Sequence, residues 1–109
     1  MELIQEMNTK RQELNAAITI LRDRGIEKAK SEHNYRVALA KEMLIQRDNK
    51  VPVTIISDIV RGNKDIAKLK LDRDISEVLY ETAFEKIRTL KMELQLLDNQ
   101  YRTEWKGVE

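Results

Sequence analysis

Cysteine is absent from the 109-residue sequence, which excludes disulfides, thiolate metal sites and cysteine nucleophiles. One proline and three glycines are too few for the many turns of a sheet protein. With a single histidine, the chain has no E-x-x-H pair of the di-iron type. No run approaches the roughly 18 apolar residues that span a bilayer, and charges near the N-terminus predict no signal peptide. We therefore expect a soluble, intracellular, all-α protein.

The charges are nearly balanced. Twenty Lys and Arg residues face nineteen Asp and Glu residues, so the net charge of +1 predicts no strong attraction to nucleic acid or acidic lipid. The sequence has no glycine-rich phosphate loop and no nucleophile motif. Acidic and basic residues alternate after residue 64, which is typical of a solvated helix face. We predict no enzyme, with no catalytic residue, cofactor or metal.

A first helix is predicted over residues 2–48, where apolar residues recur every three or four positions. The stripe comprises Ile4, Met7, Leu14, Ile18, Leu21, Ile26, Ala29, His33, Val37, Ala40 and Leu44. His33 is expected in the helix seam, capped by a carboxylate, with a role as a pH switch or as a base as the alternative. Gly25 lies inside the stripe and either bends the helix, frays it or breaks it.

The stretch VPVTIISDIVRGN is short of charge and predicts the reversal of the chain. Pro52 ends the first helix, Thr54 is expected to cap a short helix over about 55–61, and Gly62 to end it in the left-handed conformation. So short a helix needs apolar support. We expect it to pack on a stripe of the next helix formed by Leu71, Ile75 and Val78.

A last helix is predicted over residues 64–105, with Asn63 as its N-cap. Its heptad-like seam comprises Leu69, Tyr80, Ala83, Ile87, Leu90, Leu94, Leu97 and Tyr101. Arg73 falls on this seam, where a buried guanidinium needs a partner, and Asp58 or Glu42 is the expected one. Trp105 is expected beside Ile4 or Met7.

The predicted architecture is a single domain over residues 1–109. It is a long antiparallel, coiled-coil-like helical hairpin with a short helix near the tip. Two such helices carry more apolar surface than the single seam between them can bury, so a homo-oligomer is expected, with a dimer favoured. Binding to a different protein would bury that surface equally well. The candidate interaction residues are Tyr80, Ile87, Leu94, Tyr101 and Trp105.

Nucleic-acid binding is the alternative. Residues 54–73 combine a short helix, a glycine turn and a second helix, as in a helix-turn-helix, with Lys64, Lys68 and Lys70 as candidate contacts. Against this, Asp58 stands where a small residue usually lets the helices pack. The second helix also continues far beyond the length of a recognition helix.

From Tyr35 onward, several short motifs occur in a definite order: YR-x-x-L, Pro-x-T, a glycine, L-x-x-x-RD, Y-x-x-A and a C-terminal E-W. The residues that carry them are Tyr35, Arg36, Leu39, Pro52, Thr54, Gly62, Leu69, Arg73, Asp74, Tyr80, Ala83, Glu104 and Trp105. In this the chain resembles small helical proteins of phages and prophages of Gram-positive bacteria, which have no assigned chemistry. The resemblance implies a phage accessory protein in the cytosol of the bacterial host. It implies modulation of a host or phage protein in replication, recombination or defence, and it carries over no residue roles.

Overall fold

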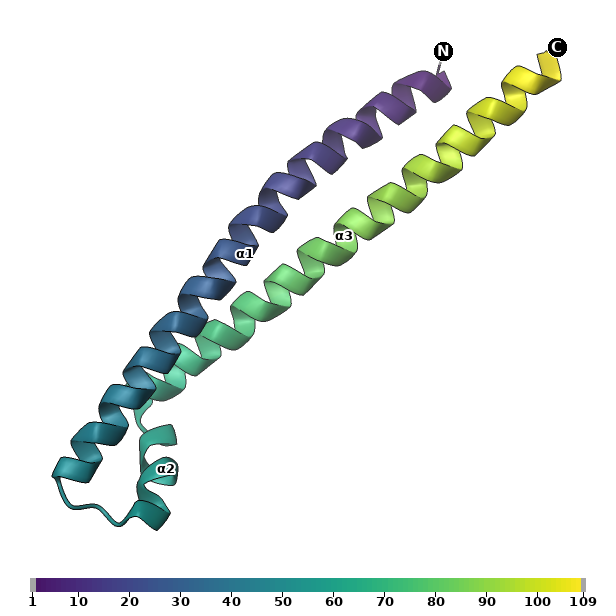
Figure 1. The fold of residues 1–109 in the computed structure, drawn as a ribbon. Helices are drawn as coiled ribbons and strands as arrows, with labels where there is room; N and C mark the ends of the chain where they lie inside the picture. The colour runs from purple at the N-terminus through teal and green to yellow at the C-terminus, as the bar shows by residue number, and fades with distance from the viewer. Residues whose placement is uncertain (1, 109) are drawn as a thin grey trace. The chain divides into compact units, whose positions relative to one another are not determined.

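A computed structural model describes residues 2–108 of the chain. It contains three helices, α1 (Glu2–Asp48), α2 (Val53–Arg61) and α3 (Lys64–Val108) (Figure 1). The predicted fold class is confirmed, because the chain is all-α and forms an antiparallel helical hairpin with a short helix between the two long ones. None of the helices in the described part combines the length and the apolar character needed to cross a membrane.

The hairpin divides into two compact units. Unit 1 is formed by Met1–Asp23 and Tyr80–Glu109, and unit 2 by Arg24–Leu79. Each long helix contributes to both units, and in each unit its two segments run in opposite directions (Figure 1). The division in α1 falls next to Gly25, yet the helix is continuous there, so Gly25 does not break it.

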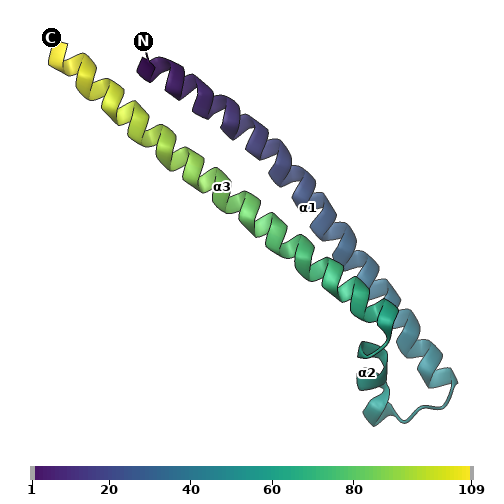
Figure 2. The ribbon, with the colours of Figure 1, turned by 180° about the vertical axis from the view of Figure 1, so that it is seen from behind.

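The core of unit 2 lies where α2 packs against both long helices, as both views of the ribbon show (Figures 1 and 2). Ile56 and Val60, one turn apart on α2, are buried with Tyr35 of α1 and Ile66 of α3. Around them lie the partly buried side chains of Ala38, Leu39, Met43, Val51 and Leu69. This apolar support explains why a helix of nine residues forms.

The predicted support for α2 was wrong. Leu71, Ile75 and Val78 remain exposed, with exposed fractions of 57%, 47% and 59%. The reason is geometric, because α2 sits in the angle between the end of α1 and the first turns of α3. There it contacts Ile66, which is buried in the first turn of α3, whereas Leu71 lies farther along the helix and is exposed.

The chain reverses through a helix cap at Lys50. The amide of Lys50 donates to the carbonyl of Arg47 at 2.9 Å, and the amide of Val51 donates to the carbonyl of Gln46 at 3.1 Å. This is the Schellman pattern, and Lys50 takes its left-handed position with φ of 62°. The left-handed cap was predicted at Gly62, where the backbone is instead right-handed with φ of −81°.

The start of α2 also differs from the prediction. The helix begins at Val53, and Pro52 stands at the N-cap rather than Thr54. The Pro52 carbonyl accepts from the amides of Ile55 and Ile56 at 3.0 and 3.2 Å. The predicted cap of α3 is confirmed, since Asn63 Oδ1 accepts from the amides of Asp65 and Ile66 at 2.9 and 3.3 Å.

The core of unit 1 is the predicted seam of α3 against α1. Ala17 of α1 is buried with Ile87 and Leu90 of α3, and Leu14 and Leu21 pack beside them. An ion pair joins the same helices, because Lys10 Nζ lies 2.7 Å from Glu93 Oε2. Glu93 has a lowered pKa through this hydrogen bond, and the pKa of Lys10 is raised by it. The two helices of unit 1 are thus joined by apolar and charged contacts.

The predicted stripe of α1 was wrong over residues 26–44. The side chains of Ile26, Ala29, His33, Val37, Ala40 and Leu44 are all exposed. The buried or half-buried side chains of this half-helix instead include Lys28, Ser31, Tyr35, Leu39 and Gln46. His33 therefore does not lie in the seam of the hairpin. The most regular apolar pattern of this half-helix faces solvent.

Candidate interaction surfaces

The open end of unit 1 contains a cleft of about 500 Å³ between the start of α1 and the end of α3. Its lining consists of Glu2, Leu3, Ile4, Glu6, Gln100, Tyr101, Glu104 and Trp105. The rings of Tyr101 and Trp105, one helical turn apart, stack with their centroids 6.5 Å apart and their planes at 13°. Two aliphatic and two aromatic side chains thus face one cleft.

The lining of the cleft is both apolar and acidic, because Glu2, Glu6 and Glu104 accompany the apolar residues. The expectation that Trp105 lies near Ile4 holds in that both line this cleft. Trp105 is nevertheless 61% exposed, so the cleft does not bury it. An exposed tryptophan stacked on a tyrosine is a type of group enriched at protein interfaces, where aromatic side chains act as anchors.

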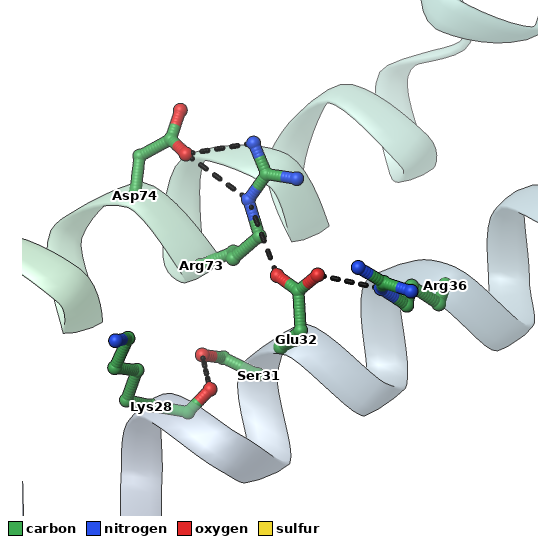
Figure 3. Close-up of polar contacts among 6 residues, drawn as sticks. All are labelled: Lys28, Ser31, Glu32, Arg36, Arg73 and Asp74. Atoms are coloured by element: carbon green, nitrogen blue, oxygen red, sulfur yellow. Dashed lines mark hydrogen bonds and ion pairs between the residues drawn. The ribbon is translucent and has the colours of Figure 1, made fainter. Parts of the chain in front are cut away.

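Arg73 forms the polar centre of unit 2 (Figure 3). Its guanidinium lies 4.6 Å from the centre of the Tyr35 ring and 3.6 Å from Glu32 Oε2, both on α1. On its own helix it donates to Asp74 Oδ1 at 3.1 and 3.0 Å. Glu32 also accepts from Arg36 at 2.6 Å, so one carboxylate serves two arginines.

The structure corrects the expected partner of Arg73. Asp58 lies exposed on α2, and Glu42 accepts a hydrogen bond from Gln46 at 2.9 Å. Arg73 pairs with Glu32 and Asp74, and the hydrogen bond to Asp74 raises the pKa of Arg73 above its ordinary value. Sequence reasoning missed Glu32 because the face of α1 was misassigned. Both carboxylates carry the opposite charge to Arg73, and the contacts of Arg73 with Glu32 and Tyr35 connect α3 to α1.

The candidate interaction residues have different environments. Ile87 is only 6% exposed and is buried by its own hairpin, which corrects the expectation that it faces a partner. Tyr80, Leu94 and Tyr101 are half-buried on the same seam. Of the five, Trp105 alone is exposed, and with Tyr101 it belongs to the cleft.

Unit 2 exposes apolar side chains on the sides of both long helices that face away from the hairpin core. On α1 these are Ile26, Val37 and Leu44, with exposed fractions of 49%, 53% and 59%. On α3 they are Leu71, Ile75 and Val78. We call these sets the α1 outer stripe and the α3 outer stripe. Two rows of branched aliphatic residues on one small unit are more apolar surface than isolated exposed side chains explain.

The lysines proposed for nucleic-acid contact are exposed, as that alternative requires. Lys64 and Lys68 lie one turn apart on the same side of α3. Lys70 lies two residues further, on a different side, and lines a small cavity with Asp74 and Arg61. A continuous phosphate-binding row of these three lysines is therefore not formed on α3.

No group of three or more His, Asp and Glu side chains among the described residues is arranged to hold a metal ion. Comparisons of the chain with protein-family models, with curated proteins and with solved structures find no match. We therefore infer a function from the exposed apolar side chains and the cleft described above.

Proposed function

We propose that this chain is a non-enzymatic interaction protein that self-associates through its helices and binds a second protein. The observation that carries the proposal is the apolar surface left exposed by unit 2 on the outer sides of α1 and α3. A hairpin of two helices has little interior, so these apolar side chains can be removed from water only by packing against another chain. The origin in a phage or prophage and the site of action in the bacterial cytosol rest on the sequence resemblance.

The cleft of unit 1 is the surface that best suits the second protein. Its stacked Tyr101 and Trp105 provide rigid apolar contact area, and the carboxylates of Glu2, Glu6 and Glu104 favour a partner with basic residues. An amphipathic helix with Lys or Arg beside its apolar face meets both requirements. A host or phage protein that carries such a helix is the partner we propose.

Size-exclusion chromatography with light scattering tests self-association. The chain has a mass of 12.8 kDa, so we expect a species of twice that mass at micromolar concentration. A species of 12.8 kDa that melts cooperatively, at every concentration up to the solubility limit, would refute self-association. Affinity capture with the intact chain and with a Trp105→Ala variant then tests the cleft, since only the intact chain is expected to retain the partner.

A further inference from the structure

The α1 outer stripe has the spacing of a coiled-coil seam. Three further exposed residues, Lys30, His33 and Ala40, lie between Ile26 and Leu44 on the same side of α1. With Val37 they complete a series of outward positions at intervals of four, three, four, three and four residues. The hairpin core uses the opposite side of the same helix, where Tyr35 is buried. This segment of α1 therefore carries two seams, and the fold of one chain occupies only the inner one.

We propose that the α1 outer stripe pairs antiparallel with the same stripe of a second copy, about a twofold axis at the level of residue 35. The inference rests on the proposed self-association and specifies its surface, its direction and its register. In this register Ile26 faces Leu44 of the second copy, Lys30 faces Ala40, and His33 faces Val37. Each layer occurs twice, as an isologous interface requires.

The charges beside the stripe favour the antiparallel direction. In an antiparallel pair, Glu27 lies beside Lys41 of the second copy, and the symmetry repeats this attraction. In a parallel pair, Arg36 would lie beside Lys41 of the second copy, and that repulsion would occur twice.

Two positively charged residues on or beside the stripe, Arg36 and Lys30, can be accommodated in this register. The antiparallel pair brings the two Arg36 side chains to the same level, but each is already bonded to Glu32 of its own chain at 2.6 Å. The small side chain of Ala40 opposite Lys30 leaves room for the aliphatic stem of the lysine to reach solvent. Lys30 thus has a place within the antiparallel register, and the charge of each Arg36 beside the stripe is balanced within its own chain.

The α3 outer stripe is a poorer surface for a second copy. Asp72 and Asp74 lie between Leu71 and Ile75 in the sequence and flank the stripe. Asp74 is bound to Arg73 of its own chain, whereas Asp72 lines the edge of a small cavity beside Ile75. Two copies packed through these residues would bring carboxylates of like charge together, so we assign self-association to α1.

The absence of native cysteine allows a direct test of the register by disulfide cross-linking. The variants are Lys30→Cys, Ala40→Cys and the double variant. In the proposed register, residue 30 of one chain faces residue 40 of the other. The double variant is therefore expected to form a reducible covalent dimer, as is a mixture of the two single variants refolded together.

Each single variant alone is expected to remain uncross-linked. Residue 30 of the two copies would be about 15 Å apart along the axis at 1.5 Å per residue, and the same holds for residue 40. A disulfide needs Cα atoms within about 7 Å, so neither pair can form one. Rapid cross-linking of the single variants would overturn the proposal in favour of a parallel pair.

A matched pair of charge substitutions separates this inference from the proposed function. Val37→Glu places two carboxylates in the interface and is expected to raise the dimer Kd about 100-fold or more, because each dimer loses two buried valines. Val78→Glu alters an equally exposed valine of the α3 outer stripe and is expected to leave the Kd unchanged. Both valines are exposed in the single chain, so both variants should fold, and circular dichroism checks this.

The outcomes are distinct. A dimer that resists Val37→Glu, or a double cysteine variant that does not cross-link, overturns the α1 pairing while self-association stands. A dimer dissociated by Val78→Glu alone moves the interface to α3 and also overturns the pairing. A chain that is monomeric throughout refutes the proposed self-association itself.

Discussion

Two neighbouring isoleucines of α2 provide the sharpest test of how the tip of the hairpin is built. Ile56 is 3% exposed in the core of unit 2, whereas Ile55 is 44% exposed on the same helix. Replacing either by alanine removes the same three carbon atoms and makes the same small change in helix propensity. The difference between the two variants therefore measures burial alone.

The expected magnitudes follow from the lost burial. At about 0.8 kcal/mol per buried carbon, Ile56→Ala loses about 2.4 kcal/mol of transfer free energy. The cavity left between Tyr35 and Ile66 raises the total to about 3 to 4 kcal/mol. Ile55→Ala loses only about half of this transfer free energy and leaves no closed cavity, so we expect it to lower the free energy of unfolding by about 1 kcal/mol.

The assay is thermal or urea unfolding followed by circular dichroism at one fixed protein concentration, because association shifts the apparent stability. Hydrogen exchange of the α2 amides supplies a second measurement and reports local undocking of α2, which a global melt underestimates. We expect faster exchange in Ile56→Ala than in Ile55→Ala. Equal losses of stability and equal exchange rates in the two variants would refute the placement of α2.

Three further outcomes are expected. The pKa of Glu93 in the folded chain is below its ordinary value of 4.5. The ion pair with Lys10 therefore stabilises the fold at pH values above 4.5, and this stabilisation disappears as the pH falls through the folded-state pKa. Glu93→Gln should therefore lower the melting temperature near neutral pH, and a similar loss in strong acid would contradict this origin. In a double-mutant cycle, Arg73→Met and Tyr35→Leu should show a coupling of about 1 kcal/mol, and additive effects would mean that the contact contributes nothing. Trp105→Ala should leave the melting temperature within about 2 °C of the parent, since the ring is mostly exposed, and a larger drop would show that it supports the hairpin.

The sequence predicted α3 well because this helix carries a single dominant seam. Ile87 and Leu90 recur on one side at heptad spacing, and the structure buries both against Ala17. The cap at Asn63 was equally readable, because a short polar side chain before a charged first turn has a local physical cause. The caps of α2 are equally local but were not predicted, because Pro52 stands at the N-cap in place of Thr54 and Gly62 is right-handed.

The inner face of α1 was not predictable in the same way. Apolar residues lie on both sides of this helix, and the more regular set, which includes Val37 and Leu44, is the outer one. Contacts with α3 determine which side of α1 faces inward, and the periodicity of the α1 sequence contains no information on those contacts. The small Ser31 is buried there, and Glu32 and Tyr35 meet Arg73 of α3.

The misassigned face also caused the errors at the candidate sites. Once His33 was placed in the seam, Glu32 was not considered as a partner for Arg73, and Asp58 or Glu42 was expected in that role. The cleft of unit 1 was predicted in part, because Trp105 was expected beside Ile4 or Met7, whereas the three glutamates of its lining were not expected there. Contacts between helices distant in sequence carry no local signal.

The position of the cleft has a consequence for anything joined to this chain. Its lining begins at Glu2 and ends at Trp105, so both ends of the described chain belong to unit 1 and lie beside the same surface (Figures 1 and 2). A fluorescent protein or purification tag fused at either end would compete with a ligand for that space. The connection around Lys50, which is exposed and held by its own backbone hydrogen bonds, belongs to unit 2. A label placed there would be attached outside the unit that holds the cleft.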